Sequence, residues 1–306
     1  MQNMFVSISQ RLKNVPKKRW LEIGFVASLT VLHFINWLVF YLFVNARGIF
    51  MGFFDEFTGE FTTRYFEVFF TELTSKSSEL SISIRNTFIT FGVQNFIVFP
   101  AALLFSYFLY KKIWAYKYFR IVFFLPNIIS QVVLVTLFRY IMNGPIADIL
   151  QDWMGLSAPP LLLNSEQYAM KSIMIYIVWV SLGSNMVILG GTFSRIPTEL
   201  VDSCKLDGAG FFKELWHISI PLIWPTLSTM ILLNFVSLLG ASGPVLLFTN
   251  GGYGTSTISF WMYSKTVVVP NHYYASAVGI VFSCVAVPLS FGVKALTDKI
   301  GTEVEF

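Results

Sequence analysis

Long apolar segments separated by short polar connections dominate the chain. Six of them reach the roughly 20 residues that an α-helix needs to cross the hydrocarbon core of a bilayer. We expect these spanning helices near 21–44, 87–110, 119–142, 170–192, 222–248 and 274–296. The pattern predicts an all-α integral membrane protein with a transmembrane domain over 21–296, preceded by a basic leader over 1–20 and followed by a tail over 297–306.

A strongly charged stretch at 194–220 (SRIPTELVDSCKLDGAGFFKELWHISI) interrupts the apolar pattern. Pro197 suits the first turn of a helix, where its missing N–H costs nothing. Asp207-Gly208 is a strong turn signal, and a second helix is predicted from about Gly210. The stretch therefore predicts a helix–turn–helix at the membrane surface, with one apolar and one charged face. The alternative is an ordinary amphipathic loop at the interface.

This helix–turn–helix resembles the EAA loop of binding-protein-dependent ABC transporter permeases. The family pattern begins with Pro-x-Glu-Leu, continues with Glu-Ala-Ala and then Asp-Gly-Ala, and ends with Ile-x-x-Pro. The present chain follows it from Pro197 to Pro221, except that Asp-Ser-Cys replaces Glu-Ala-Ala and shortens the stem of the carboxylate. The resemblance implies that the following residues couple the chain to an ATPase subunit: Glu199, Asp202, Ser203, Cys204, Asp207, Gly208 and Ala209.

Lys and Arg residues gather in alternate connections: the leader, 111–120, the 194–220 stretch and the tail. Connections on the cytoplasmic side of a membrane protein carry such an excess. We therefore expect a multi-pass protein of the cell membrane, with both termini and the 194–220 stretch in the cytoplasm.

The composition agrees with a chain surrounded by lipid, because 55% of the residues are hydrophobic and only 12% are charged. A soluble domain of this length would carry about twice that charge. The net charge of +4 does not indicate nucleic acid, since the basic residues sit at segment ends. The two cysteines have no metal-site spacing. The sequence contains no P-loop and no catalytic motif, so we expect neither an enzyme nor a nucleotide or metal cofactor in this chain.

A second resemblance concerns the sugar-transporting subgroup of these permeases. The segment 249–257 is similar to its Thr-Gly-Gly-Gly-Pro run followed by Thr, although Tyr253 or Gly254 stands where the proline would be. The run 123–126 (Phe-Phe-Leu-Pro) also resembles that subgroup, and the likeness extends over about 86–296. It implies the permease subunit of an ABC importer for a carbohydrate, which we expect to be an oligosaccharide.

The resemblance also implies partners. These are a second, different permease subunit, two cytoplasmic ATPase subunits that bind ATP and Mg, and an extracytoplasmic solute-binding protein. Two other functions stay open. One is an ABC permease for a solute such as glycerol phosphate or a polyamine, and the other is an ion-coupled secondary transporter. The central portions of the spans lack acidic residues, which argues against ion coupling.

A sugar site should combine neutral donors and acceptors with aromatic surfaces, because a sugar offers hydroxyls and apolar C–H faces. Small polar and amide side chains inside the spans supply that chemistry, and Asn234 is our first choice. Such residues also commonly hold membrane helices together, which is the alternative reading. The candidates for the solute path are Gln131, Trp179, Ser181, Ser184, Asn185, Asn234 and Ser237.

Overall fold

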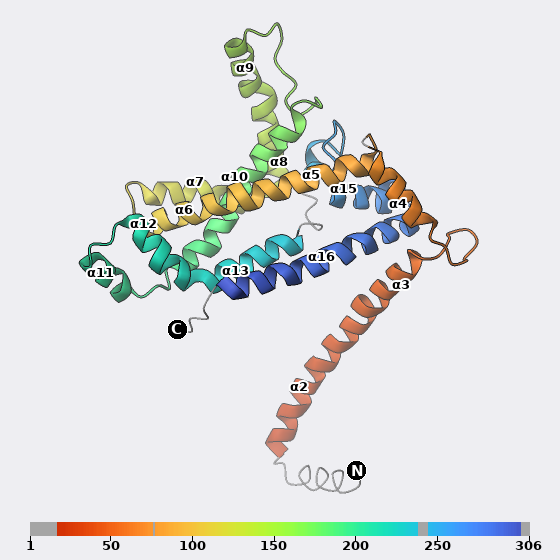
Figure 1. Ribbon diagram of the computed structural model, residues 1–306, viewed down its shortest axis with the longest axis horizontal. Coiled ribbons are helices and arrows are strands. Elements are labelled where there is room, and N and C mark those ends of the chain that lie inside the picture. Colours follow the sequence, from red (N-terminus) through yellow and green to blue (C-terminus); the bar gives the residue numbers. More distant parts are fainter. Residues whose placement is uncertain (1–16, 76, 238–243, 301–306) are drawn as a thin grey trace.

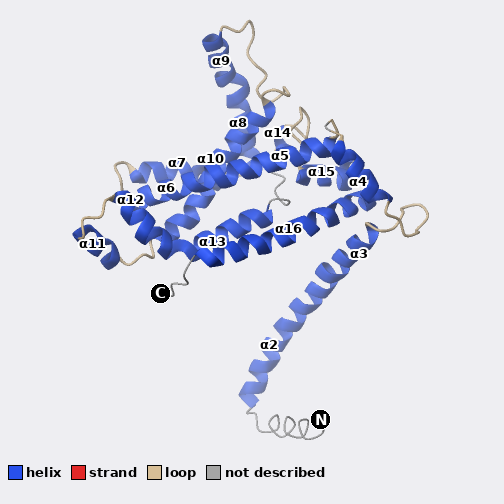
Figure 2. Cartoon of the chain, in the orientation of Figure 1, coloured by secondary structure: helices blue, strands red, loops and turns tan. Residues whose placement is uncertain are grey.

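The computed structural model describes residues 17–75, 77–237 and 244–300 of the chain. These ranges consist of helices and loops (Figure 2), and their one β-type contact is an isolated bridge between Phe54 and Phe61. Most of the predicted leader and of the predicted tail lies outside the described residues.

Within the described ranges, six helical segments are long and apolar enough to cross a membrane. They are Gly24–Met51, Glu79–Tyr110, Gln131–Met154, Ala169–Phe193, Phe211–Val236 and His272–Ile300. The prediction of an all-α membrane protein with six spanning helices and a helix–turn–helix between two of them is therefore confirmed.

Four of the helical segments are composite, because a wider, π-type turn joins two α-helices. These segments are α2 (Lys17–Asn36) to α3 (Val44–Met51), α5 (Glu79–Val93) to α6 (Phe99–Tyr110), α8 (Gln131–Ile141) to α9 (Ala147–Met154), and α12 (Phe211–Glu214) to α13 (Ile220–Val236). The remaining helices are α4 (Arg64–Thr74), α7 (Tyr116–Ile128), α10 (Ala169–Phe193), α11 (Thr198–Leu206), α14 (Val245–Phe248), α15 (Ile258–Tyr263) and α16 (His272–Ile300).

The third apolar segment differs most from the expected bounds, since the pattern predicts one helix over 119–142. The structure has two helices, α7 and α8, separated by Ile129 and Ser130 in non-helical conformation, with ψ of 141° and 134°. α7 lies along the bundle, whereas α8 and α9 leave it at a steep angle (Figure 1). Pro126 already removes one helical hydrogen bond inside α7. Non-helical backbone at membrane depth is tolerated where it lines a cavity, and an apolar run does not reveal such a break.

The 194–220 unit, defined by those residue numbers, also differs in one respect. The sequence predicts that the unit ends before a separate spanning helix near 222–248, but the helix continues from α12 through Pro221 and Pro225 to the end of α13. A wider turn over 215–219 precedes the first proline. Local widening and neighbouring groups allow proline inside spanning helices, because they satisfy the freed backbone groups.

α10 runs through the centre of the bundle and packs against α6 and α7, while α13 packs against α16. One apolar cluster joins α6 and α10 to the 194–220 unit and includes Tyr107, Leu189, Phe193, Val201 and Leu215. In contrast, the spanning part of α2–α3 buries none of its residues in this chain. That helix extends away from the bundle (Figure 1), so its apolar surface is available to lipid or to another protein.

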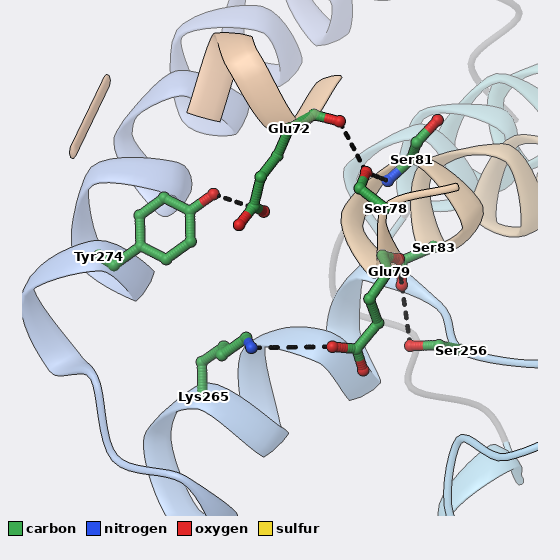
Figure 3. Close-up of polar contacts among 8 residues, drawn as sticks. All are labelled: Glu72, Ser78, Glu79, Ser81, Ser83, Ser256, Lys265 and Tyr274. Atoms are coloured by element: carbon green, nitrogen blue, oxygen red, sulfur yellow. Dashed lines mark hydrogen bonds and ion pairs between the residues drawn. The ribbon is translucent and has the colours of Figure 1, made fainter. Parts of the chain in front are cut away.

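Polar contacts tie α4, α5 and α16 together at the end of the bundle opposite to α11 (Figure 3). The hydroxyl of Tyr274 donates a hydrogen bond to Glu72 Oε2 at 2.8 Å. The hydroxyl of Ser78 donates to the carbonyl of Glu72 at 2.6 Å, and Lys265 Nζ lies 3.7 Å from Glu79 Oε2. These contacts fix the start of α5, the helix that leads toward the centre of the membrane.

Candidate functional site

The break between α7 and α8 forms one wall of a cavity of about 370 Å³. Its other walls are the end of α5 with the turn after it, the middle of α10, and the residues that precede α14 and α15. The polar lining residues are Thr90, Gln94, Asn127, Gln131, Tyr176, Ser181 and Thr257. The apolar lining residues are Pro126, Ile129, Leu134, Ile177, Val180 and Pro244. The described walls therefore offer hydrogen-bonding groups beside apolar surface, and all of these groups are neutral.

Tyr176 is the most deeply buried of the polar groups at this cavity. Its side chain is 2% exposed, and its ring packs edge-on against Phe138 and Phe248, with centroids 5.3 and 5.0 Å away. Its hydroxyl has no hydrogen-bond partner among the described residues. A buried hydroxyl without a partner is costly, so a ligand hydroxyl that supplied the missing bond would be favoured.

Asn127 is held at the cavity wall by a close approach of α7 to α10. The hydroxyl of Ser184 donates to Asn127 Oδ1 at 2.5 Å. Gly183 allows the approach, because a Cβ there would collide with the carbonyl oxygen of Phe123 and with Asn127 Nδ2. A larger residue at position 183 would push the two helices apart and displace the asparagine.

Gln131 and Ser181, two of the residues predicted for the solute path, line the cavity. Ser184 does not line the cavity itself, but its hydroxyl donates a hydrogen bond to Asn127, which does. Asn185 instead donates from Nδ2 to the carbonyl of Ser181 at 2.9 Å, inside its own helix. Trp179 packs beside the apolar cluster formed by α8, α10 and α14.

Asn234 and Ser237 are not among the cavity-lining residues. The hydroxyl of Ser237 donates to the carbonyl of Asn234 at 3.0 Å at the end of α13. The chain directly after them, 238–243, lies outside the described residues. Their place on the solute path stays a prediction.

Sequence reasoning missed five polar residues of the cavity: Thr90, Gln94, Asn127, Tyr176 and Thr257. Three of these carry a usable signal. Asn127 follows a proline inside an apolar run, and Thr90 lies four residues before Gln94, which places both on one helix face. Tyr176 stands in an apolar run and looks like an ordinary core residue.

The second candidate site is α11 of the 194–220 unit, whose carboxylate side chains are exposed. The predicted coupling residues Glu199, Asp202, Ser203 and Asp207 are all exposed. Asp202 Oδ1 accepts a hydrogen bond from Lys205 Nζ at 2.8 Å. This hydrogen bond, together with the negative charge of Asp202, raises the pKa of Lys205 above its ordinary value.

The turn after α11 has the geometry that the Asp-Gly signal predicts. Gly208 has a φ of +73°, in the left-handed region that favours glycine. Its N–H donates to the carbonyl of Lys205 at 3.0 Å, and the N–H of Ala209 donates to the carbonyl of Cys204 at 3.1 Å. These two bonds form a Schellman cap, which sets the direction in which the chain leaves α11.

Cys204 differs from the exposed members of the predicted coupling set, because it is only 7% exposed. It points into the protein together with Val201, one turn earlier. The exposed apolar residues of α11 are Leu200, at 41%, and Leu206, at 89%. The surface that α11 offers to another protein therefore combines carboxylates with leucine side chains.

The loop over 249–257 is fixed on α5 by side chains of that helix. Asn86 Nδ2 donates to the carbonyls of Gly254 and Ser256 at 2.7 and 2.9 Å. The hydroxyl of Ser83 donates to Ser256 Oγ at 2.8 Å (Figure 3). Backbone with positive φ occurs at Gly254 and at Tyr253, which stands near the missing proline of the resemblance.

A family model described as "Binding-protein-dependent transport system inner membrane component" matches residues 98–302. Two curated relatives come from Bacillus subtilis (strain 168). The "Probable ABC transporter permease protein YurN" is 27% identical over 178 residues, which cover 56% of this chain and 61% of that protein. The "Polygalacturonan/rhamnogalacturonan transport system permease protein YteP" is 24% identical over 227 residues, covering 72% of this chain and 70% of that protein. The matched part is thus less than two thirds of the first relative's length.

A solved structure shows the same fold. In a crystal structure of a bacterial alginate ABC transporter in complex with alginate pentasaccharide-bound periplasmic protein, one chain aligns with a TM-score of 0.76 at 20% identity. The alignment covers 94% of this chain and 99% of that one. The likeness therefore includes the projecting helices as well as the central bundle.

Proposed function

This chain belongs to the family of binding-protein-dependent transport system inner membrane components, and we propose that it is the membrane-spanning permease subunit of an ABC importer for a carbohydrate. We expect the solute to be an oligosaccharide. The family consists of membrane transport components rather than enzymes, and the chain is accordingly a multi-pass protein of the inner membrane.

The cavity at the α7–α8 break is the observation that carries the carbohydrate proposal. Its neutral polar groups suit the many hydroxyls of a sugar, and its apolar groups suit the C–H faces. A sugar hydroxyl would also complete the hydrogen bonding of Tyr176. A glycerol phosphate or a polyamine would meet no opposite charge on the described walls. Two similar proteins, a polygalacturonan/rhamnogalacturonan transport permease and an alginate transporter, are named for polysaccharides, which also supports a carbohydrate as the solute.

The 194–220 unit supports the proposed source of energy. Exposed carboxylates and Leu206 on α11 form a surface that a cytoplasmic ATPase subunit could bind. Two such subunits would bind ATP and Mg, and their closure would turn the unit and switch the pathway from inward-facing to outward-facing. Such a switch works because the ATP-bound subunits contact the two states of the membrane part differently.

Two further partners complete the proposal. A second, different permease subunit would cover the apolar surfaces of α2–α3 and α8–α9, which project from this chain (Figure 1). An extracytoplasmic solute-binding protein would deliver the sugar. The periplasmic protein bound to the structurally similar alginate transporter supports this last partner.

We further propose that both termini and the 194–220 unit lie in the cytoplasm, and the distribution of Lys and Arg supports this orientation. A reporter that is active only in the cytoplasm should work after Phe306 and at Gly208. It should fail at Lys76 and at Tyr253. Activity at Tyr253 would contradict this orientation.

The function is tested by uptake into vesicles that contain the complete importer. Sugar uptake should require ATP and the separate ATPase subunits, whereas uptake driven by an ion gradient alone would refute the proposal.

Tyr176→Phe removes only the hydroxyl at the cavity and should slow uptake about two- to tenfold, the cost of one hydrogen bond. Tyr140→Phe is the matched control, since Tyr140 lies on α8, is 73% exposed and does not line the cavity. Equal rates in both variants would remove the cavity from the solute path.

A further inference from the structure

Glu214 is a buried carboxylate that the solute cavity does not use. It belongs to α12 and is 3% exposed. Lys111, the residue directly after α6, forms an ion pair with it, and the two side chains are 18% and 4% exposed for the lysine and the glutamate. A buried charge that loses its partner destabilises a protein strongly, so each group holds the other in place.

Aromatic residues surround this ion pair. Lys111 Nζ lies 5.6 and 5.8 Å from the ring centroids of Tyr107 and Tyr110. The hydroxyl of Tyr107 donates to the carbonyl of Phe211 at 3.3 Å, and the ring of Phe211 stacks on Phe108 with centroids 5.1 Å apart. Cations bind favourably to aromatic faces, and the rings also keep water away from the charges. The end of α6 and the start of α12 are therefore joined by charge, hydrogen bond and ring contacts at one place.

We propose that Lys111 and Glu214 form a clamp that transmits movement of the 194–220 unit to the α5–α6 helix. The proposal rests on the proposed function, because the movement in question is the one that an ATPase subunit would apply to α11. Both are positioning residues: they touch neither the solute nor the ATPase surface of α11.

The need for such a clamp follows from how each cavity wall is connected. α10 carries Tyr176 and Ser181 and reaches the unit through the chain itself, because α11 follows it after a short connection. α5 and the turn after it carry Thr90 and Gln94, but a long stretch of sequence separates α6 from α12. The α5–α6 wall can therefore follow the unit only through side-chain contacts. Among the described residues these include the apolar cluster shared by α6, α10 and the unit, and the buried ion pair, which is the ionic link between α6 and α12.

The deciding variant is the double substitution Lys111→Met with Glu214→Leu. Replacing both charges by apolar groups leaves no unpaired buried charge, so the complex should unfold near the wild-type temperature. The clamp is nevertheless lost. We expect the ATP hydrolysed per imported sugar to rise at least about fivefold, the lower end of ordinary coupling effects. A wild-type ratio in the stable double variant would overturn the proposal, because a merely structural ion pair predicts that result.

Two further variants separate the clamp from a general effect of charge. Lys111→Arg keeps a cation between the two tyrosine rings and should keep the wild-type ratio. Lys112→Met removes a charge from the next, exposed position and should also keep it. A raised ratio in Lys112→Met equal to that of the double variant would overturn the proposal.

A distance measurement tests the clamp without transport. Spin labels at Trp114 and Phe212, which are 90% and 64% exposed, report the separation of the chain after α6 from α12. The distance distribution should broaden in the double variant of the assembled importer, and an unchanged width would overturn the clamp. If wild-type uptake proves independent of the ATPase subunits, the proposed function fails, while this measurement still decides whether the clamp exists.

Discussion

The two helices of the 194–220 unit carry the same kind of ion pair in opposite surroundings. In α11, the side chains of Asp202 and Lys205 are 67% and 59% exposed. In α12, those of Glu214 and its partner Lys111 are 4% and 18% exposed. Water and salt weaken an exposed pair, whereas a buried pair keeps its strength and cannot lose one member without a large penalty. The charges of α11 are therefore free to change partners, as the proposed docking to an ATPase subunit requires, whereas the buried charges of α12 hold the fold together.

The capped turn at Gly208 separates α11, with its exposed ion pair, from α12, with its buried one. Gly208 caps α11 in the left-handed conformation, so α12 begins at a defined angle to α11. α11 itself is attached mainly through apolar residues, Val201 and Cys204. The unit thus consists of an exposed helix, which we propose docks the ATPase subunit, on one side of a capped turn and an anchored helix on the other.

The largest effect is expected from removing one member of the buried pair. Lys111→Met leaves the Glu214 carboxylate buried and unpaired, which should lower the free energy of unfolding by about 3–5 kcal/mol. Thermal unfolding of the purified importer would show this loss. The matched control is Lys205→Met, which removes a lysine from the exposed pair and should hardly change the unfolding temperature. Equal losses in both variants would contradict the comparison.

The turn should give the next largest effect. Gly208→Val places a branched side chain at a φ of +73°, which costs roughly 1–2 kcal/mol and distorts the cap. We expect the solute-binding protein to dock normally while ATP hydrolysis no longer follows sugar delivery. Gly210→Val is the control, because Gly210 has a φ of −74° and open space around it. If both variants transport at the wild-type rate, the turn does not set the geometry of docking.

A smaller effect is expected at the surface of α11 that we propose binds the ATPase subunit. Leu206 is 89% exposed, so Leu206→Ala should not alter the unfolding temperature. We expect the affinity for the ATPase subunit to fall about fivefold, corresponding to about 1 kcal/mol for one apolar contact in an interface. Phe57→Ala provides the control, since Phe57 is 91% exposed but lies at the far end of the bundle. Titration of the ATPase subunit onto both variants separates docking from general surface hydrophobicity.

The parts of the molecule that the sequence predicts well are those set by local chemistry. Apolar length alone identifies six spans, because a bilayer admits few alternatives to a long helix. The Asp-Gly pair at 207–208 marks the turn in the same way, since few residues adopt its backbone conformation. Local sequence signals alone therefore predict that the 194–220 unit consists of two helices joined by a turn.

The parts that the sequence does not reveal depend on contacts between distant segments. The break at Ile129 and Ser130 exists because the backbone there lines a cavity that other helices complete. Lys111 reads as one more basic residue at the end of a span, and only the fold brings Glu214 to it. Cys204 stands in the motif beside exposed positions, yet the direction of its side chain buries it.

The smallest effect should come from the exposed pair itself. Asp202→Asn removes the negative charge, and weakens the hydrogen bond, that raise the pKa of Lys205 above its ordinary value of 10.5. A lysine pKa that is higher in the folded state stabilises the folded protein fully at any pH below the ordinary pKa. This contribution is lost only as the pH rises through the folded-state pKa. Thermal unfolding of Asp202→Asn should therefore run parallel to the wild type between about pH 6 and 9, with a small constant offset. The two curves should converge only at higher pH. A separation that changes with pH near neutrality would mean that Asp202 interacts with a group other than Lys205, and α11 would then be less free to exchange partners than its exposure indicates.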